Sequence, residues 1–168
     1  MAVVTGATGN LGAAVLRAYL THGTHVAAAV RDAAKGESLR SALSDVAGTA
    51  EDPRLLVIEA DPADTSAMEA LVERVLRAWG RLDILNNLAG IFKGGPALDT
   101  GLIRELWETN VLTAVSAGAA CLRPMRARGY GRIVSVSSKA ASMSSSCSIP
   151  SRASRARTIS SCRRADAR

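Results

Sequence analysis

The sequence predicts an α/β protein in which about five parallel strands form a doubly wound sheet with helices on both faces. Two observations and one general rule lead to this prediction. Short apolar runs alternate with segments of helical periodicity over residues 1–138. Five apolar strands separated by helices are typical of a parallel sheet that is covered on both faces. Right-handed crossovers between successive parallel strands then place helices on both sides of the sheet.

The five expected strands are short apolar runs bounded by turn residues. They cover residues 1–6, 25–30, 54–61, 81–90 and 131–138. Ligands of open α/β sheets bind outside the carboxyl ends of the strands, so the segments that follow these strands are the first places to look for a site.

The expected helices differ in the strength of their pattern. In residues 10–23, which end at the stop signal Gly23, one face carries Leu11, Val15, Ala18 and Tyr19. Residues 36–48 form a weaker helix closed by Gly48. The clearest pattern has apolar residues at spacings of three and four: Met68, Leu71, Val72, Val75, Leu76 and Trp79. Ser66 and Glu69 are available there as a capping box. A long helix over residues 102–122 has one stripe: Ile103, Leu106, Trp107, Asn110, Val111 and Ala114.

The last 30 residues, 139–168, differ in composition from the rest. They hold nine serines, six arginines and a single acid, Asp166, while residues 1–138 carry 14 basic and 14 acidic residues. The net charge of +6 therefore belongs to this segment alone. We expect a domain over residues 1–138 and a disordered Ser/Arg-rich tail. With only 3% aromatic residues, we expect no nucleic-acid partner.

Membrane and secretion signals are weak in this sequence. No apolar run approaches 18 residues, and residues 1–9 do not read as a signal peptide. The three cysteines, Cys121, Cys147 and Cys162, are odd in number and lack metal-ligand spacing. We therefore expect a cytoplasmic protein with no membrane segment and no metal site.

The strongest local motif is TGATGNLG, residues 5–12, between the first expected strand and the first expected helix. Gly6, Gly9 and Gly12 allow a tight turn, close approach of a pyrophosphate to the backbone, and close packing of helix on strand. The helix N-terminus then offers free N–H groups to phosphates. This context predicts a Rossmann-like dinucleotide site. The alternative is a tight strand–helix turn without a ligand.

The sequence resembles the short-chain dehydrogenase/reductase family in five motifs that occur in the family's order. Thr5, Gly6 and Gly12 match its Thr-Gly-x-x-x-Gly-x-Gly turn, with Asn10 in place of the middle glycine. The other four motifs are DPAD, NNLAG, ETNV and GRIVSVSS. In NNLAG, Leu88 replaces the family's second asparagine. The resemblance covers residues 1–138, about four-fifths of the chain.

The resemblance implies a nicotinamide dinucleotide as cofactor. It places Asp61 against the adenine. The resemblance, the glycine turn and the end of the second strand together give these cofactor-binding residues: Gly6, Thr8, Gly9, Asn10, Leu11, Gly12, Arg31, Asp61, Asn87, Ala89 and Gly90.

The end of the second strand bears on the choice of cofactor. An acid there would bind the ribose 2′-hydroxyl of NAD, but the position is Val30 and Arg31 follows. An arginine can accept the 2′-phosphate through charge-assisted hydrogen bonds. The sequence therefore favours NADP over NAD. The alternative is that Arg31 is solvated and Asp32 reaches the ribose.

The resemblance also implies two catalytic residues. Asn110 corresponds to an asparagine that holds a water in a proton relay, and Ser138 to a serine that hydrogen-bonds the carbonyl of a small-molecule carbonyl or alcohol substrate. From the residues alone, Asn110 is expected to be buried on the apolar stripe of its helix, so a purely structural hydrogen bond is an alternative role. Ser138 read alone would more often be a turn residue.

The family's chemistry also needs a tyrosine and, four residues later, a lysine. The chain has two tyrosines, and Gly23 and Val134 stand four residues after Tyr19 and Tyr130. We therefore expect an oxidoreductase by family whose own chain is inactive, truncated or frame-shifted after the strand that ends at Ser138. The alternative is a catalytically silent dinucleotide-binding module. Family members pair through the long helix, which makes a homo-oligomer an expectation as well.

Overall fold

The computed structural model describes residues 1–47, 54–94, 99–137 and 157–159. Its sheet has the strand order β3-β2-β1-β4-β5-β6. The strands are β1 (Ala2–Thr5), β2 (Val26–Val30), β3 (Leu55–Glu59), β4 (Ile84–Asn87), β5 (Arg132–Ser137) and β6 (Arg157–Ile159). The first five are parallel, as predicted. The three residues of β6 pair antiparallel with β5, in a segment where the sequence showed no strand pattern.

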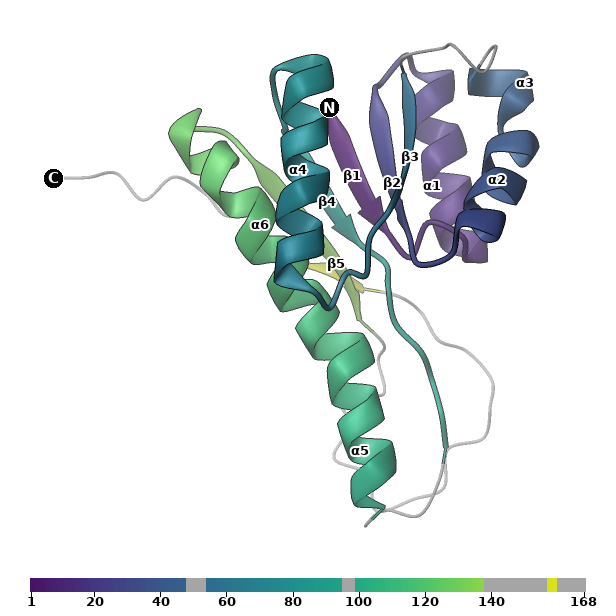
Figure 1. Cartoon of the computed structure of the whole chain (residues 1–168), viewed down its shortest axis with the longest axis vertical. Coiled ribbons are helices and arrows are strands. Elements are labelled where there is room, and N and C mark those ends of the chain that lie inside the picture. Colours follow the sequence, from purple (N-terminus) through teal and green to yellow (C-terminus); the bar gives the residue numbers. More distant parts are fainter. Residues whose placement is uncertain (48–53, 95–98, 138–156, 160–168) are drawn as a thin grey trace, which may run out of the picture.

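Helices cover both faces of the sheet, which confirms the doubly wound prediction (Figure 1). They are α1 (Asn10–Thr21), α2 (Ala33–Ala42), α3 (Ser44–Ala47), α4 (Thr65–Trp79), α5 (Thr100–Trp107), a π-helical turn η1 (Glu108–Leu112) and α6 (Thr113–Ala127). α1 and α2 pack on one face, and α4 and α6 pack on the other. α5 extends beyond the carboxyl edge of the strands (Figure 1). No helix in the described ranges is both long enough and apolar enough to cross a membrane.

The buried face of α1 matches the prediction only in part, because Val15 and Tyr19 pack against the core but Leu11 and Ala18 do not. Gly12, Leu16 and Leu20 are buried, whereas Leu11 is 49% exposed and Ala18 is exposed. The reason lies at the start of the helix, where Gly12 packs against the backbone of the preceding turn. This contact fixes the rotation of the helix, and the residues four and eight positions later follow Gly12 into the core.

The start of α4 also differs from the prediction. Asp64, not Ser66, is the N-cap, and its Oδ1 accepts from the N–H groups of Ser66 and Ala67 at 2.8 and 3.2 Å. Asp32 caps α2 in the same way, so that helix begins at Ala33 instead of residue 36. Aspartate is as good an N-cap as serine, and the sequence offered both before α4.

The long helix is less buried than its apolar stripe predicted. Neither α5 nor η1 has a buried residue, Trp107 is 57% exposed, and Asn110 is exposed rather than buried. Burial begins in α6, whose buried residues are Thr113, Ser116, Ala117, Ala120, Cys121 and Met125. No element in the described part of the chain covers the apolar face of α5.

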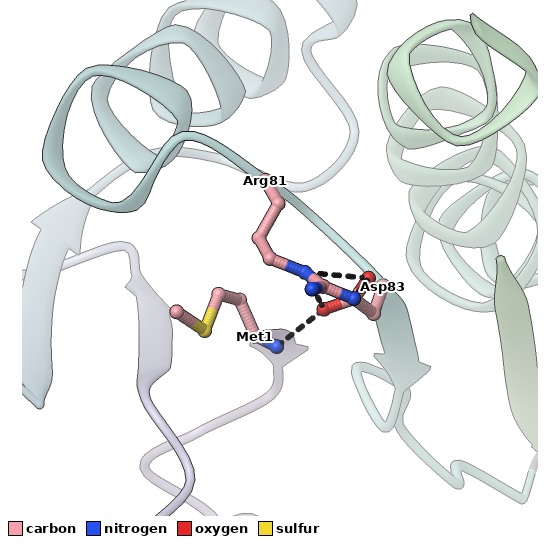
Figure 2. A network of polar contacts seen from close by, with 3 residues as sticks. All are labelled: Met1, Arg81 and Asp83. Atoms are coloured by element: carbon pink, nitrogen blue, oxygen red, sulfur yellow. Dashed lines mark hydrogen bonds and ion pairs between the residues drawn. The ribbon is translucent and has the colours of Figure 1, made fainter. Parts of the chain in front are cut away.

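A polar network fixes the amino ends of two central strands (Figure 2). Asp83 is 6% exposed and accepts hydrogen bonds from Arg81 and from the Met1 ammonium, the latter at 2.7 Å. Burial raises the pKa of Asp83, but the bonds from Arg81 and Met1 outweigh it and hold that pKa below its ordinary value. The backbone N–H of Asp83 also donates to the Met1 carbonyl. The network therefore ties β1 to β4 at the edge opposite the carboxyl ends.

Candidate functional site

The residues proposed from the sequence gather at the carboxyl edge of the sheet. The glycine turn follows β1, Arg31 follows β2 and Asp61 follows β3. Asn87 ends β4, and Ala89 and Gly90 lie two and three residues further along the chain. The strand order reverses between β1 and β4, which is where open α/β sheets bind ligands.

The glycine turn after β1 has little room for side chains. Gly6 has φ of +64°, and a Cβ there would lie 2.6 Å from the backbone of Leu88 and Ala89. A Cβ on Gly12 would lie 2.3 Å from the Gly6 carbonyl oxygen. At Gly9, in contrast, φ is −79° and the nearest atom to a Cβ is 3.4 Å away. The fold therefore requires glycine at positions 6 and 12 but not at position 9.

The N-terminus of α1 differs from those of α2, α4 and α5. Asp32, Asp64 and Asp99 cap these three helices with their carboxylates. The N-cap of α1 is Gly9, which has no side chain to cap the helix, and the first turn holds no acid. Its first N–H groups and its positive dipole therefore face the carboxyl edge of the sheet, where they suit an anion.

Thr5 joins the two loops that border the switch point. Its side chain is fully buried, and its Oγ1 accepts from the N–H groups of Leu88 and Ala89 at 3.2 and 3.3 Å. With Gly6 packed against the same two residues, the glycine turn and the loop after β4 form one unit. Thr5 was part of the predicted motif but had no predicted role, because its partners lie more than 80 residues away in the sequence.

Asn87 is buried at the end of β4 on the face that α4 and α6 cover. Its Nδ2 donates to Ser135 Oγ on β5 at 3.3 Å. Within the described part of the chain, Oδ1 of Asn87 has no hydrogen-bond partner. A buried carbonyl oxygen without a donor is costly, so this atom suits a bound water.

Asn110 lies in the π-helical turn and holds the loop after β4. Its Oδ1 accepts from the Ile91 N–H at 2.9 Å. A methyl group at Gly90 would lie 2.6 Å from that oxygen, so glycine there lets the loop approach the helix. π-turns inside α-helices are frequent at functional sites. The loop after β4 is thus fixed on one side by Thr5 and on the other by Asn110.

The two residues that bear on the choice of cofactor have different surroundings. Asp32 Oδ1 accepts from the N–H groups of Ala34 and Lys35 at 2.8 and 3.1 Å as the cap of α2. Arg31 is exposed at the end of β2 and makes no hydrogen bond or ion pair with the residues that the structure describes. Its guanidinium group remains available to a ligand.

Asp61 lies in the turn between β3 and α4. Its Oδ1 accepts from the Ala63 N–H at 2.9 Å. The side chain is exposed at the carboxyl edge, on the same side of the switch point as Arg31. Ser138, the other predicted catalytic residue, follows the last residue of β5 and lies outside the described residues.

Neither tyrosine lies at the position that the family's chemistry requires. Tyr19 Oη accepts from Asn86 Nδ2 at 2.9 Å and so links α1 to β4 on the face opposite Asn87. Tyr130 precedes β5, at the amino end of that strand. Among the described residues no group of three His, Cys, Asp or Glu side chains could hold a metal ion.

The fold and the glycine turn define a Rossmann-like α/β protein. The family model for short chain dehydrogenases matches residues 1–164, a range that includes most of the Ser/Arg-rich segment. The chain is 31% identical over 147 residues to D-threitol dehydrogenase of Mycolicibacterium smegmatis, covering 85% of this chain and 54% of that protein. It is 33% identical over 145 residues to 2,3-dihydro-2,3-dihydroxybenzoate dehydrogenase of Bacillus subtilis, covering 84% and 53%.

Solved structures give the same result. Sorbitol-6-phosphate 2-dehydrogenase of Erwinia amylovora superposes with a TM-score of 0.77 at 26% identity, covering 86% of this chain and 57% of that one. A variant of actinorhodin polyketide ketoreductase with NADPH superposes with a TM-score of 0.76 at 28% identity, covering 86% and 55%. The chain belongs to the short chain dehydrogenase family. It spans about half the length of the relatives it matches.

Proposed function

We propose that this chain binds NADP(H) at the carboxyl edge of its sheet and transfers no hydride, or almost none, to a carbonyl substrate. The family reaction moves a hydride between the nicotinamide and a small carbonyl or alcohol compound, and the cofactor supplies that chemistry. The chain's own residues would bind the dinucleotide, orient it and handle the proton. The observation that supports binding most directly is the start of α1, which has no side-chain cap and follows the closely packed glycine turn.

The pyrophosphate fits the turn after β1. The exposed Thr8, Gly9 and Asn10 lie at the start of α1, where the helix dipole and free N–H groups favour negative charge. Leu11 is also half exposed at this end of the helix. Gly9 carries no side chain that would keep a phosphate from the backbone. The residues present therefore fit the phosphates of a dinucleotide.

The 2′-phosphate of NADP fits the end of β2. Arg31 is exposed there without a partner among the described residues, and Lys35 lies in the first turn of α2. Asp32, the acid that could favour NAD, has one oxygen committed to the helix cap. This arrangement supports NADP over NAD.

The proton-transfer half of the family's machinery is what the chain lacks. Asn110 and Ser138 match the family's asparagine and serine, but the sequence contains no Tyr-x-x-x-Lys. Without a tyrosine to donate the proton and a lysine to lower its pKa, hydride transfer would build negative charge on the carbonyl oxygen with no acid to neutralise it. Binding without turnover is the expected behaviour.

The test measures binding and turnover on the same protein. Calorimetry with NADPH and NADH gives the two dissociation constants, and NADPH absorbance with a panel of ketones and aldehydes gives the rate. We expect NADPH to bind more tightly than NADH, and Arg31→Ala to weaken NADPH about tenfold or more while leaving NADH unchanged. Arg77→Ala is the matched control, because Arg77 is an exposed arginine that lies on α4, away from the end of β2.

Each part of the proposal has its own contrary result. Absence of binding to either cofactor refutes the site. Equal effects of Arg31→Ala on the two cofactors refute the preference for NADP. Reduction of a ketone at rates typical of enzymes, about 1 per second or faster, refutes the proposed inactivity.

We also propose an oligomeric state and a cellular compartment for this chain. The exposed apolar face of α5, with Ile103 and Trp107, suits pairing with a second copy of the chain. A reducing, cytoplasmic compartment suits a chain whose Cys121 is a buried free thiol. Sedimentation equilibrium of the wild type and of Trp107→Glu tests the pairing, since a charge in an apolar interface should dissociate the pair.

A further inference from the structure

Ser116 makes a contact that packing alone does not require. It lies on α6 and is 7% exposed, and its Oγ donates to the Ala63 carbonyl at 3.0 Å. The bond joins α6 to the turn between β3 and α4, across 53 residues of sequence. Ser116 is thus a buried polar side chain whose only hydrogen-bond partner in the described structure belongs to a loop at the carboxyl edge.

That loop carries Asp61. The N–H of Ala63 donates to Asp61 Oδ1 at 2.9 Å, and the N–H of Asp64 donates to the Asp61 carbonyl at 3.0 Å. Ala63 therefore uses its donor to hold the Asp61 carboxylate and its acceptor to meet Ser116. Because both groups belong to one residue, fixing the carbonyl restricts the backbone that presents the N–H to Asp61.

Helix packing has other supports. α4 and α6 share an apolar cluster that includes Met68, Leu71, Ala117, Ala120 and Cys121. Asp64 caps α4 without help from Ser116. An alanine at position 116 could make the same apolar contacts. The specific contribution of Ser116 is therefore its hydrogen bond to the Ala63 carbonyl.

α6 also continues from the helix that carries Asn110. Asn110 holds the loop after β4 through Ile91, and Ser116, six residues later, holds the turn after β3. One continuous helical segment, Thr100–Ala127, therefore fixes a loop on each side of the switch point.

We propose that Ser116 is a positioning residue for the adenine half of the dinucleotide site, because its hydroxyl holds the turn that aims Asp61. This inference rests on the proposed function and on the place beside the adenine that the family resemblance implies for Asp61. Ser116 does not contact the ligand. It acts through Ala63, so its loss should affect the adenine end of the ligand and leave the nicotinamide end unaffected.

The experiment compares two halves of the ligand. Adenosine 2′,5′-bisphosphate probes the adenine end and reduced nicotinamide mononucleotide probes the other, each by NMR titration, with intact NADPH measured by calorimetry. Ser116→Ala should weaken the bisphosphate and NADPH about tenfold, the equivalent of one hydrogen bond, and leave the mononucleotide unchanged. Ser116→Thr, which keeps a hydroxyl, should restore most of the affinity.

Two controls separate positioning from stability. Ser44→Ala removes an exposed serine bond, from its Oγ to the Ser41 carbonyl, and should change neither fragment. Asp61→Asn should give the same selective loss as Ser116→Ala, and the double variant should be no weaker than the worse single variant, because both act on one contact. A merely structural role would lower the melting temperature and leave both fragment affinities equal to those of the wild type.

The outcomes are distinguishable from failure of the proposed function. If wild-type protein binds neither NADPH nor the bisphosphate, the proposed function fails and this inference fails with it. If wild type binds both and Ser116→Ala leaves the bisphosphate unchanged, or weakens the two fragments equally, only the role of Ser116 is overturned. Additive losses in the double variant would also overturn it.

Discussion

Replacing Gly6 with alanine tests how the two loops at the switch point are joined. The left-handed φ of +64° costs an alanine about 1–2 kcal/mol. The new methyl would also lie 2.6 Å from the backbone of Leu88 and Ala89, and relieving such an overlap costs about 1–3 kcal/mol more. The sum of about 2–5 kcal/mol corresponds to a fall in melting temperature of roughly 10 °C for a chain of this size.

Gly80 provides the matched control for this prediction. It has φ of +70° at the C-terminus of α4, and nothing lies within 4 Å of a Cβ placed there. Gly80→Ala therefore carries the conformational cost of about 1–2 kcal/mol without the overlap. Thermal unfolding followed by circular dichroism measures both variants. Equal losses of stability in Gly6→Ala and Gly80→Ala would refute the close contact between the glycine turn and the loop after β4.

Three other predictions concern separate parts of the molecule. Gly9→Ala should leave stability within about 0.5 kcal/mol of wild type, because its Cβ has room, yet weaken NADPH in calorimetry; unchanged affinity would count against the phosphate site. Burial raises the pKa of Cys121 to about 12, so iodoacetamide at pH 8 should label this thiol, mapped by mass spectrometry, only when the protein is unfolded. Asp83→Asn should cost about 1–3 kcal/mol at pH 7 in urea unfolding. Because the folded pKa of Asp83 is lowered, its contribution is present above the unfolded pKa of about 4 and is lost as pH falls further, so the wild-type and variant curves should converge in acid; parallel curves would contradict this.

The sheet could be predicted because the runs that form β1 and β2 are apolar on both sides and buried throughout. An unbroken apolar run such as residues 26–30, placed between two helical segments, is best explained as a buried strand of a parallel sheet. The rotation of α1 could not be predicted in the same way. Leu11 and Leu16 are equally apolar, and the choice between them depends on where Gly12 meets the backbone of the turn.

Apolar periodicity also failed to predict burial along α5 and η1. The stripe that includes Ile103 and Trp107 is real, but a periodic pattern shows only that a face is apolar and not what covers it. Asn110 was expected to be buried on that stripe and is exposed instead, bonded to a loop.

The order of the site residues along the sheet followed from the sequence, because parallel strands bring their carboxyl ends to one edge. The contacts that hold these residues in place could not be predicted from the sequence. Thr5 meets Leu88 and Ala89, and Ser116 meets Ala63, across 53 to 84 positions of sequence. A single hydroxyl has no periodicity, so nothing in the residue pattern marks its partner.

The aspartates that begin α2, α4 and α5 have an electrostatic consequence for any anion that approaches this edge. Asp32, Asp64 and Asp99 each bring a negative charge to a helix start that would otherwise attract phosphate. A negatively charged molecule is therefore disfavoured at the starts of α4 and α5 and favoured at the start of α1, while at α2 the exposed Arg31 and Lys35 offset the charge of Asp32. The starts of these helices therefore differ in how well they suit a phosphate, through repulsion at α4 and α5 as well as attraction at α1.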